Sequence, residues 1–141
     1  MLVAMGKRRQ ILALKALVAP SESVVWTGIL IQTTLLSEVR LKFKVRALLT
    51  QNALIWSSLR DLDHPIRIEY LEMLDPQITL TGIVGHYSFS IPADESRQSG
   101  EEGENFLGIL FGGVPAAFID YLVSRLPDIQ LLSPALQQRY L

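Results

Sequence analysis

The chain of 141 residues contains no cysteine. This absence excludes disulfide bonds, thiolate nucleophiles and cysteine-based zinc or iron–sulfur sites. Histidine is nearly as scarce, since only His64 and His86 are present. His64 lies in a turn-like DLDHP segment and His86 in a Gly-His-Tyr segment typical of a strand, and a joint metal site would also need carboxylates. We therefore expect a structural role for each histidine, no metal and no cofactor.

Charged residues are also few, at 19% of the chain against 49% hydrophobic residues. The net charge of −1 provides no overall field that would attract nucleic acid or an anionic membrane. A chain of this length suits a single domain over residues 1–141. Its mean hydropathy of +0.28 predicts either an extensive interior or an apolar surface that meets a partner.

No catalytic motif is present. The acidic pairs Asp61/Asp63 and Glu101/Glu102 lie in predicted loops, with no histidine or nucleophile at a spacing that suits acid–base chemistry. Three glycines between positions 108 and 113 do not match the spacing of a phosphate-binding loop. We therefore assign no catalytic residue and expect that the protein is not an enzyme.

Residues 1–20 form an N-terminal segment in which a basic cluster, GKRR, precedes a short apolar stretch. Lys15 interrupts that stretch, and no small-residue cleavage site follows cleanly. This pattern favours an opening helix or strand with a cationic start over a secretory signal. The expected location is cytoplasmic.

Four segments between residues 24 and 91 have the composition of strands. Residues 24–34 are rich in β-branched side chains, and residues 66–70 and 78–91 alternate between apolar and polar positions. The most regular alternation places apolar side chains on one face and cations on the other, namely Val39, Leu41, Phe43 and Val45 against Arg40, Lys42, Lys44 and Arg46. We predict an α+β fold, with a four-stranded antiparallel sheet followed by a C-terminal helix that packs on one face.

The cationic row of the second strand raises the possibility of a nucleic-acid surface. Glu69 and Glu72 on a neighbouring strand could neutralise the row, and no aromatic side chain interleaves with the cations to stack on bases. A solvated sheet face, with no nucleic-acid partner, is the favoured interpretation.

Residues 92–105 form a predicted acidic flexible loop, and an apolar stretch follows it. Pro115, Asp120 and three glycines within this stretch argue against a membrane span. The preferred interpretation is an apolar linker followed by a helix from about Pro115 to Arg125, because proline suits the first helical turn.

This predicted helix is apolar nearly all round. One side carries Val114, Ala117, Phe118, Tyr121 and Leu122, and the other carries Ile119, Val123 and Leu126. One side can face the sheet, so the other side is expected to meet a second subunit or a client.

The order of features in the second half of the chain is similar to that of SecB-type export chaperones. Phe89-Ser90-Ile91 closes a strand, Ile109-Leu110-Phe111 follows a polar stretch, and the helix ends in Val123-Ser124-Arg125 before a proline-containing tail. The resemblance covers residues 78–141, whereas the cationic sheet face and the Gly-Gly-Val-Pro helix start depart from the family pattern. It implies a non-catalytic chaperone, or holdase, that binds unfolded polypeptide, preprotein or antitoxin clients in apolar grooves, and that assembles as a dimer or tetramer.

Carried over to this chain, the resemblance implies a client-binding surface and a packing surface. The client-binding positions are Phe106, Leu107, Ile109, Leu110 and Phe111, and the packing or oligomer positions are Phe118, Tyr121 and Leu122. Two alternatives remain open, which are a small β-rich carrier of an apolar ligand and a non-catalytic structural subunit of a larger assembly.

Overall fold

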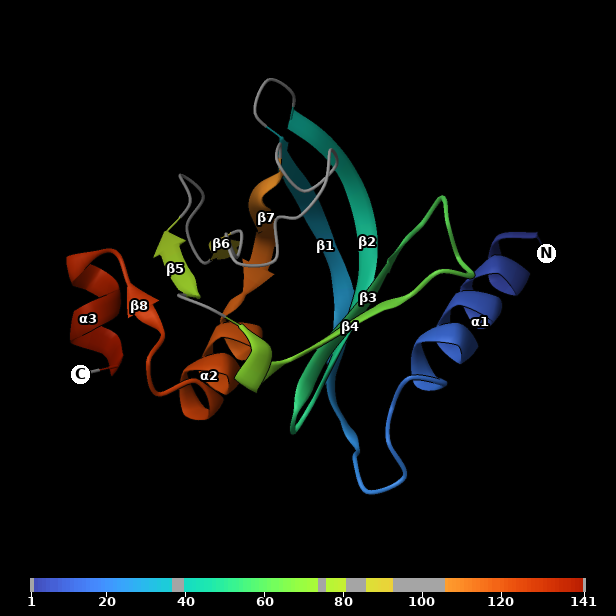
Figure 1. Cartoon of the computed structure of the whole chain (residues 1–141), viewed down its shortest axis with the longest axis horizontal. Helices are drawn as coiled ribbons and strands as arrows, with labels where there is room; N and C mark the ends of the chain where they lie inside the picture. Colours follow the sequence, from blue (N-terminus) through green and yellow to red (C-terminus); the bar gives the residue numbers. More distant parts are fainter. Residues whose placement is uncertain (1, 37–39, 74–75, 81–85, 93–105, 141) are drawn as a thin grey trace. The chain divides into compact units, whose positions relative to one another are not determined.

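A computed structural model describes residues 2–36, 40–73, 76–80, 86–92 and 106–140 (Figure 1). Within these residues the helices are α1 (Leu2–Lys15), α2 (Ala116–Arg125), α3 (Pro134–Tyr140) and the 3-10 helix η1 (Tyr70–Glu72). The strands are β1 (Val24–Leu36), β2 (Arg40–Thr50), β3 (Ala53–Ser58), β4 (Ile66–Glu69), β5 (Gln77–Leu80), β6 (His86–Pro92), β7 (Phe106–Pro115) and β8 (Gln130–Leu131).

The predicted four-stranded antiparallel sheet with a single helix is wrong. The described strands form an eight-stranded sheet in the order β4-β3-β2-β1-β7-β6-β5-β8. The sheet is mixed, because β8 pairs with β5 in parallel while β2 and β3, for example, pair antiparallel. The sequence patterns identified β1, β2 and β4, but the single strand predicted over residues 78–91 is wrong, because β5 and β6 are two strands that pair antiparallel. The patterns missed β3, β7 and β8 and left α1 and α3 undecided.

The chain divides into two compact units. Unit 1 comprises Met1–Leu30 and Phe43–Glu72, and unit 2 comprises Ile31–Lys42 and Met73–Leu141.

In unit 1, α1 packs on the sheet through a small apolar cluster. Leu14 contacts Leu48 of β2 and Ile55 of β3, and Leu17 and Val18 pack against the same cluster. Leu14 lies in the last turn of α1, and Leu17 and Val18 lie in the turn directly after it, so the cluster fixes this end of the helix to the strands.

The alternation predicted over residues 39–46 is present where the structure describes side chains, and it ends beyond Arg46. Lys44 is exposed and Val45 is buried, but Ala47, Leu48, Leu49 and Thr50 are all buried. Both faces of β2 are therefore covered at this end, because α1 lies over the face that carries Leu48.

In unit 2, residues 106–115 form strand β7 rather than a linker. β7 pairs antiparallel with β1 on one side and with β6 on the other. Tyr87 faces Val114 and Phe89 faces Phe111, so Ser88 lies opposite two residues, Gly112 and Gly113. This arrangement is a β-bulge, and Gly113 within it has a positive φ of 67°, a backbone conformation that favours glycine.

Helix α2 begins one residue after the predicted start, with Pro115 as its N-cap in an extended conformation. It packs on β6 and β7, where Phe118 lies with its ring centroid 6.0 Å from that of Phe89. Ile119, which belongs to the opposite predicted side, is also fully buried, and Leu126 is 6% exposed. The chain itself therefore covers Ile119 of the helix and Leu126 directly after it.

Candidate functional site

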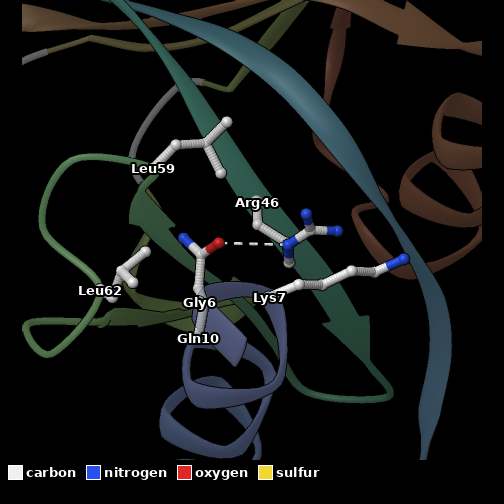
Figure 2. A pocket seen from close by; sticks show the side chains of 6 residues that line it. All are labelled: Gly6, Lys7, Gln10, Arg46, Leu59 and Leu62. Atoms are coloured by element: carbon white, nitrogen blue, oxygen red, sulfur yellow. Dashed lines mark hydrogen bonds between the residues drawn. The ribbon is translucent and has the colours of Figure 1, made fainter. Parts of the chain in front are cut away.

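A pocket in unit 1 lies between α1, β2 and the segment that follows β3. It has a volume of about 260 Å³ and is lined by Gly6, Lys7 and Gln10 from α1, Arg46 from β2, and Leu59 and Leu62 from the segment after β3 (Figure 2). The pocket thus combines two cations and two leucines, and no acidic side chain lines it.

Gln10 fixes the polar wall of the pocket. Gln10 is 1% exposed. The two hydrogens of its Nε2 are shared among three acceptors, which are the carbonyl oxygen of Ser57 at 3.0 Å, Ser57 Oγ at 2.7 Å and the carbonyl oxygen of Ser58 at 3.1 Å. Its Oε1 accepts a hydrogen bond from Arg46 Nε at 3.1 Å, drawn as a dashed line in Figure 2. A buried amide that is satisfied at both ends holds one conformation, so the guanidinium of Arg46 is oriented in advance.

The apolar wall is held in place by polar contacts of the turn that carries Leu62. Arg9 of α1 binds Asp63 with two nitrogens, with Nε donating to Oδ1 at 2.8 Å, and Asp61 Oδ1 lies 2.6 Å from Nδ1 of His64. The hydrogen bond to Asp61 raises the pKa of His64, because the carboxylate stabilises the imidazolium. Asp61, Asp63 and His64 therefore act as turn and anchoring residues, which agrees with their structural interpretation from the sequence.

Within the described part of the chain, the two cations of the pocket form no ion pair. Among the described residues, no carboxylate lies within ion-pair distance of Lys7 or Arg46. The predicted neutralisation of β2 by Glu69 and Glu72 is wrong, because β3 lies between β2 and β4. Glu69 instead pairs with Arg67 of its own strand.

A buried ion pair lies elsewhere in unit 1 and serves the fold. The side chain of Glu22 is 1% exposed and accepts hydrogen bonds from Arg67 Nη1 at 2.6 Å and Thr50 Oγ1 at 2.7 Å, and from the backbone nitrogen of Ala19 at 2.7 Å. The hydrogen bond from Arg67 is the main cause that lowers the pKa of Glu22 to about 2. A carboxylate saturated in this way holds the segment before β1 against β2 and β4, and it is not available as a general base.

The residues predicted to bind clients lie in β7 of unit 2 and are not among the residues that line the pocket. Ile109 and Leu110 are half-buried, and Phe111 is fully buried, with its ring stacked 6.3 Å from that of Phe89. The side chains of Phe106 and Leu107 lie outside the part of the chain whose side chains the structure describes.

The residues predicted to pack the C-terminal helix lie in α2. Phe118 and Leu122 are fully buried, and Tyr121 is half-buried with its hydroxyl 3.1 Å from Arg125 Nε. Glu101, Glu102, Gly82 and Gly85 lie outside the described residues. Within the described part of the chain, no three histidine or acidic side chains group as metal ligands would.

Sequence reasoning missed the pocket although it had noted some of its members. The GKRR cluster and the cationic row of β2 supplied Lys7 and Arg46, but Gln10, Leu59 and Leu62 carry no signal in a single sequence. Only the packing of α1 on β2 and β3 brings these five side chains together.

Comparisons with known proteins give no family for the chain. No protein-family model matches it, and no relative is found among curated proteins. Solved structures that resemble it include the hSac2 domain from human phosphoinositide phosphatase Sac2, at 14% identity and a TM-score of 0.42 over 85% of this chain and 74% of that one. A likeness this remote carries no argument about function.

The resemblance to SecB-type chaperones is wrong. The resemblance implied a four-stranded antiparallel sheet with a single helix, whereas the described residues form an eight-stranded mixed sheet with the helices α1, α2 and α3. The short matching motifs, such as Ile109-Leu110-Phe111, fall in strand β7 rather than in a connection before a helix.

The structure also bears on the predicted absence of a membrane span. In the described ranges, the helices are too short or too polar to cross a bilayer, and the apolar stretch that raised the question is divided between β7 and α2.

Proposed function

We propose that this chain is a non-catalytic binding protein and that unit 1 binds a small anionic group in the pocket between α1, β2 and the segment after β3. The observation that carries the proposal is the pair of cations, Lys7 and Arg46, in a pocket whose lining includes no acid. Ligand pockets use a few placed polar groups to fix an orientation, and here Gln10 holds the guanidinium that would pair with the ligand.

Binding is better supported than catalysis. The six lining residues include no histidine, serine, threonine, cysteine or carboxylate that could act as a hydroxyl or thiol nucleophile or as a general base. Arginine and lysine together suit phosphate and carboxylate groups, because arginine offers a planar set of donors and lysine a compact charge.

The test is a titration of the ¹⁵N-labelled chain with inorganic phosphate at constant ionic strength, with dissociation constants taken from amide shifts. We expect the largest shifts in the first half of α1 and around Arg46. Lys7→Ser and Arg46→Met should each weaken binding about tenfold or more, because each removes a hydrogen bond to a charged group.

Two matched controls separate the pocket from general charge. Arg8→Ser and Lys44→Met remove one exposed cation each from α1 and β2, next to but outside the pocket lining. They should change the dissociation constant less than twofold. Equal losses in all four variants, or no saturable shift in the native chain, would contradict the proposal.

Capture of unfolded clients, assembly into a dimer or tetramer, and a cytoplasmic location stay predictions from the sequence. The predicted far side of the helix gives less support to a second subunit, because Ile119 and Leu126 are buried within the chain, whereas Val123 is half-buried. Light scattering measures the mass of the protein in solution, and an aggregation assay with an unfolded client measures chaperone activity. A protein that has the mass of a single chain and does not slow client aggregation would contradict the chaperone prediction.

A further inference from the structure

The pocket has two chemically different ends. Lys7 and Arg46 bring charge, whereas Leu59 and Leu62 bring branched apolar side chains. Leu59 lines the pocket and is 37% exposed, so part of its apolar surface is open to a ligand. The long methylene stems of Lys7 and Arg46 can cover an apolar ligand segment while their charged ends hold an anion.

Gly6 provides a second and independent observation. It lies within α1, where glycine is a poor helix former compared with alanine. A Cβ at this position would lie 3.7 Å from Leu62 Cδ1, which is ordinary van der Waals contact, so alanine would fit without strain. The glycine therefore leaves open a methyl-sized space in the pocket wall, on the side of Leu62.

From these two observations we infer that the ligand is an anionic amphiphile, meaning an alkyl phosphate or an alkyl compound with a similar anionic group. The anion lies at Lys7 and Arg46, and a short alkyl segment lies on Gly6, Leu59 and Leu62. The inference rests on the proposed function. A pocket of about 260 Å³ is slightly smaller than the ~300–1,000 Å³ of sites for drug-sized ligands, so it suits a head group and a few methylenes.

The test compares inorganic phosphate with ethyl, butyl and hexyl phosphate, each titrated below its micelle concentration into the ¹⁵N-labelled chain. Full burial of one methylene is worth about fourfold in affinity, so a partly open pocket should give about two- to threefold per methylene over the first members of the series. The gain should then level off once the alkyl segment reaches solvent.

Variants locate the effect. Leu62→Ser and Leu59→Ser should flatten the series, so that each variant binds butyl and hexyl phosphate no more tightly than it binds inorganic phosphate. Gly6→Ala should reduce the gain per methylene and raise the melting temperature, because the added methyl fills pocket space and favours the helix. Leu12→Ser is the matched control, since Leu12 is 69% exposed on α1 and does not line the pocket.

The outcomes separate the inference from the proposed function. Saturable phosphate binding with a flat alkyl series overturns the inference and leaves the proposed function standing. Absence of phosphate binding overturns the proposed function itself. Abolition of the affinity gain per methylene to the same extent by Leu12→Ser and Leu62→Ser is a third outcome. That result also overturns the inference, because the alkyl chain then binds outside the pocket.

A vesicle arm distinguishes the source of the amphiphile. Sedimentation with phosphatidylcholine vesicles that contain 20% phosphatidic acid, competed by hexyl phosphate and lost in Leu62→Ser, supports a membrane lipid as the ligand. Hexyl phosphate binding without sedimentation supports a water-dissolved amphiphile. Sedimentation that neither hexyl phosphate nor Leu62→Ser reduces overturns the assignment of the lipid to this pocket.

Discussion

Two pairs of charged side chains in unit 1 differ in whether their charges are neutralised by ion pairs. Glu22 and Arg67 are paired and enclosed, with further hydrogen bonds to Thr50 and Ala19. Lys7 and Arg46 have no such acid among the described residues and line a pocket. A buried ion pair that is fully hydrogen-bonded holds structure, whereas unneutralised cations at a pocket remain available to a ligand.

The Glu22–Arg67 pair gives a prediction for pH dependence. The pKa of Glu22 is lowered to about 2 from an ordinary value of 4.5, so its contribution to stability is fully present above pH 4.5 and is lost as the pH falls towards 2. We expect the free energy of unfolding, measured by urea titration, to fall by about 2–3 kcal/mol more over this range than in Glu22→Gln. Parallel pH profiles for the native chain and the variant would contradict this assignment.

At the scale of elements, β7 shows how a glycine-rich apolar segment becomes a strand. Its residues 106–115 contain three glycines, which lower strand propensity, yet partners on both sides satisfy its backbone. The bulge at Gly112 and Gly113 absorbs one extra residue, and directly after it the strand ends at Pro115 and α2 begins.

This bulge predicts unequal effects of two neighbouring substitutions. Gly113→Ala places a side chain at a φ of 67°, which costs about 1–2 kcal/mol of unfolding free energy. Gly112→Ala is the control, because its added Cβ meets only the carbonyl oxygen of Ile31 at 3.9 Å. Urea denaturation measures both, and equal losses would show that the positive φ is not the cause.

Side chains of helix α3 connect it to α2 and β6. Tyr140 donates a hydrogen bond to Asp120 of α2, and Arg139 lies 3.3 Å from the hydroxyl of Tyr87 on β6. Burial is the main cause that raises the pKa of Tyr140 to about 12. The irregular tail that the sequence suggested is thus a helix tied to two other elements of unit 2.

At the scale of the whole molecule, the net charge of −1 conceals an uneven distribution. Unit 1 contains 8 Lys and Arg against 5 Asp and Glu, a net charge of +3, whereas unit 2 contains 5 against 9, a net charge of −4. The net charge of the whole chain suggested that no anionic ligand would be attracted. The positive charge of unit 1 shows that this argument does not apply to unit 1.

The distribution predicts that phosphate binding depends on salt. Raising sodium chloride from 50 to 500 mM should weaken binding by about three- to tenfold, because the screening length falls below the distance between the ligand and the outlying cations of unit 1. Titrations followed by amide shifts at each concentration measure the effect. A dissociation constant that does not change with salt would contradict a binding energy that is mainly electrostatic.

The sequence by itself determined the features that depend on neighbours along the chain. The two-residue alternation around Lys44 and Val45 predicted β2, and Pro115 followed by an apolar run predicted α2 to within one residue, because strand pleat and helix turn are local repeats. Short apolar runs such as residues 53–58 fit a strand or a helix equally well, so β3 and β7 became strands only through their partners. The pocket belongs to the tertiary structure alone, because Lys7 and Arg46 are far apart in the sequence and meet only where Leu14 fixes α1 on β2 and β3.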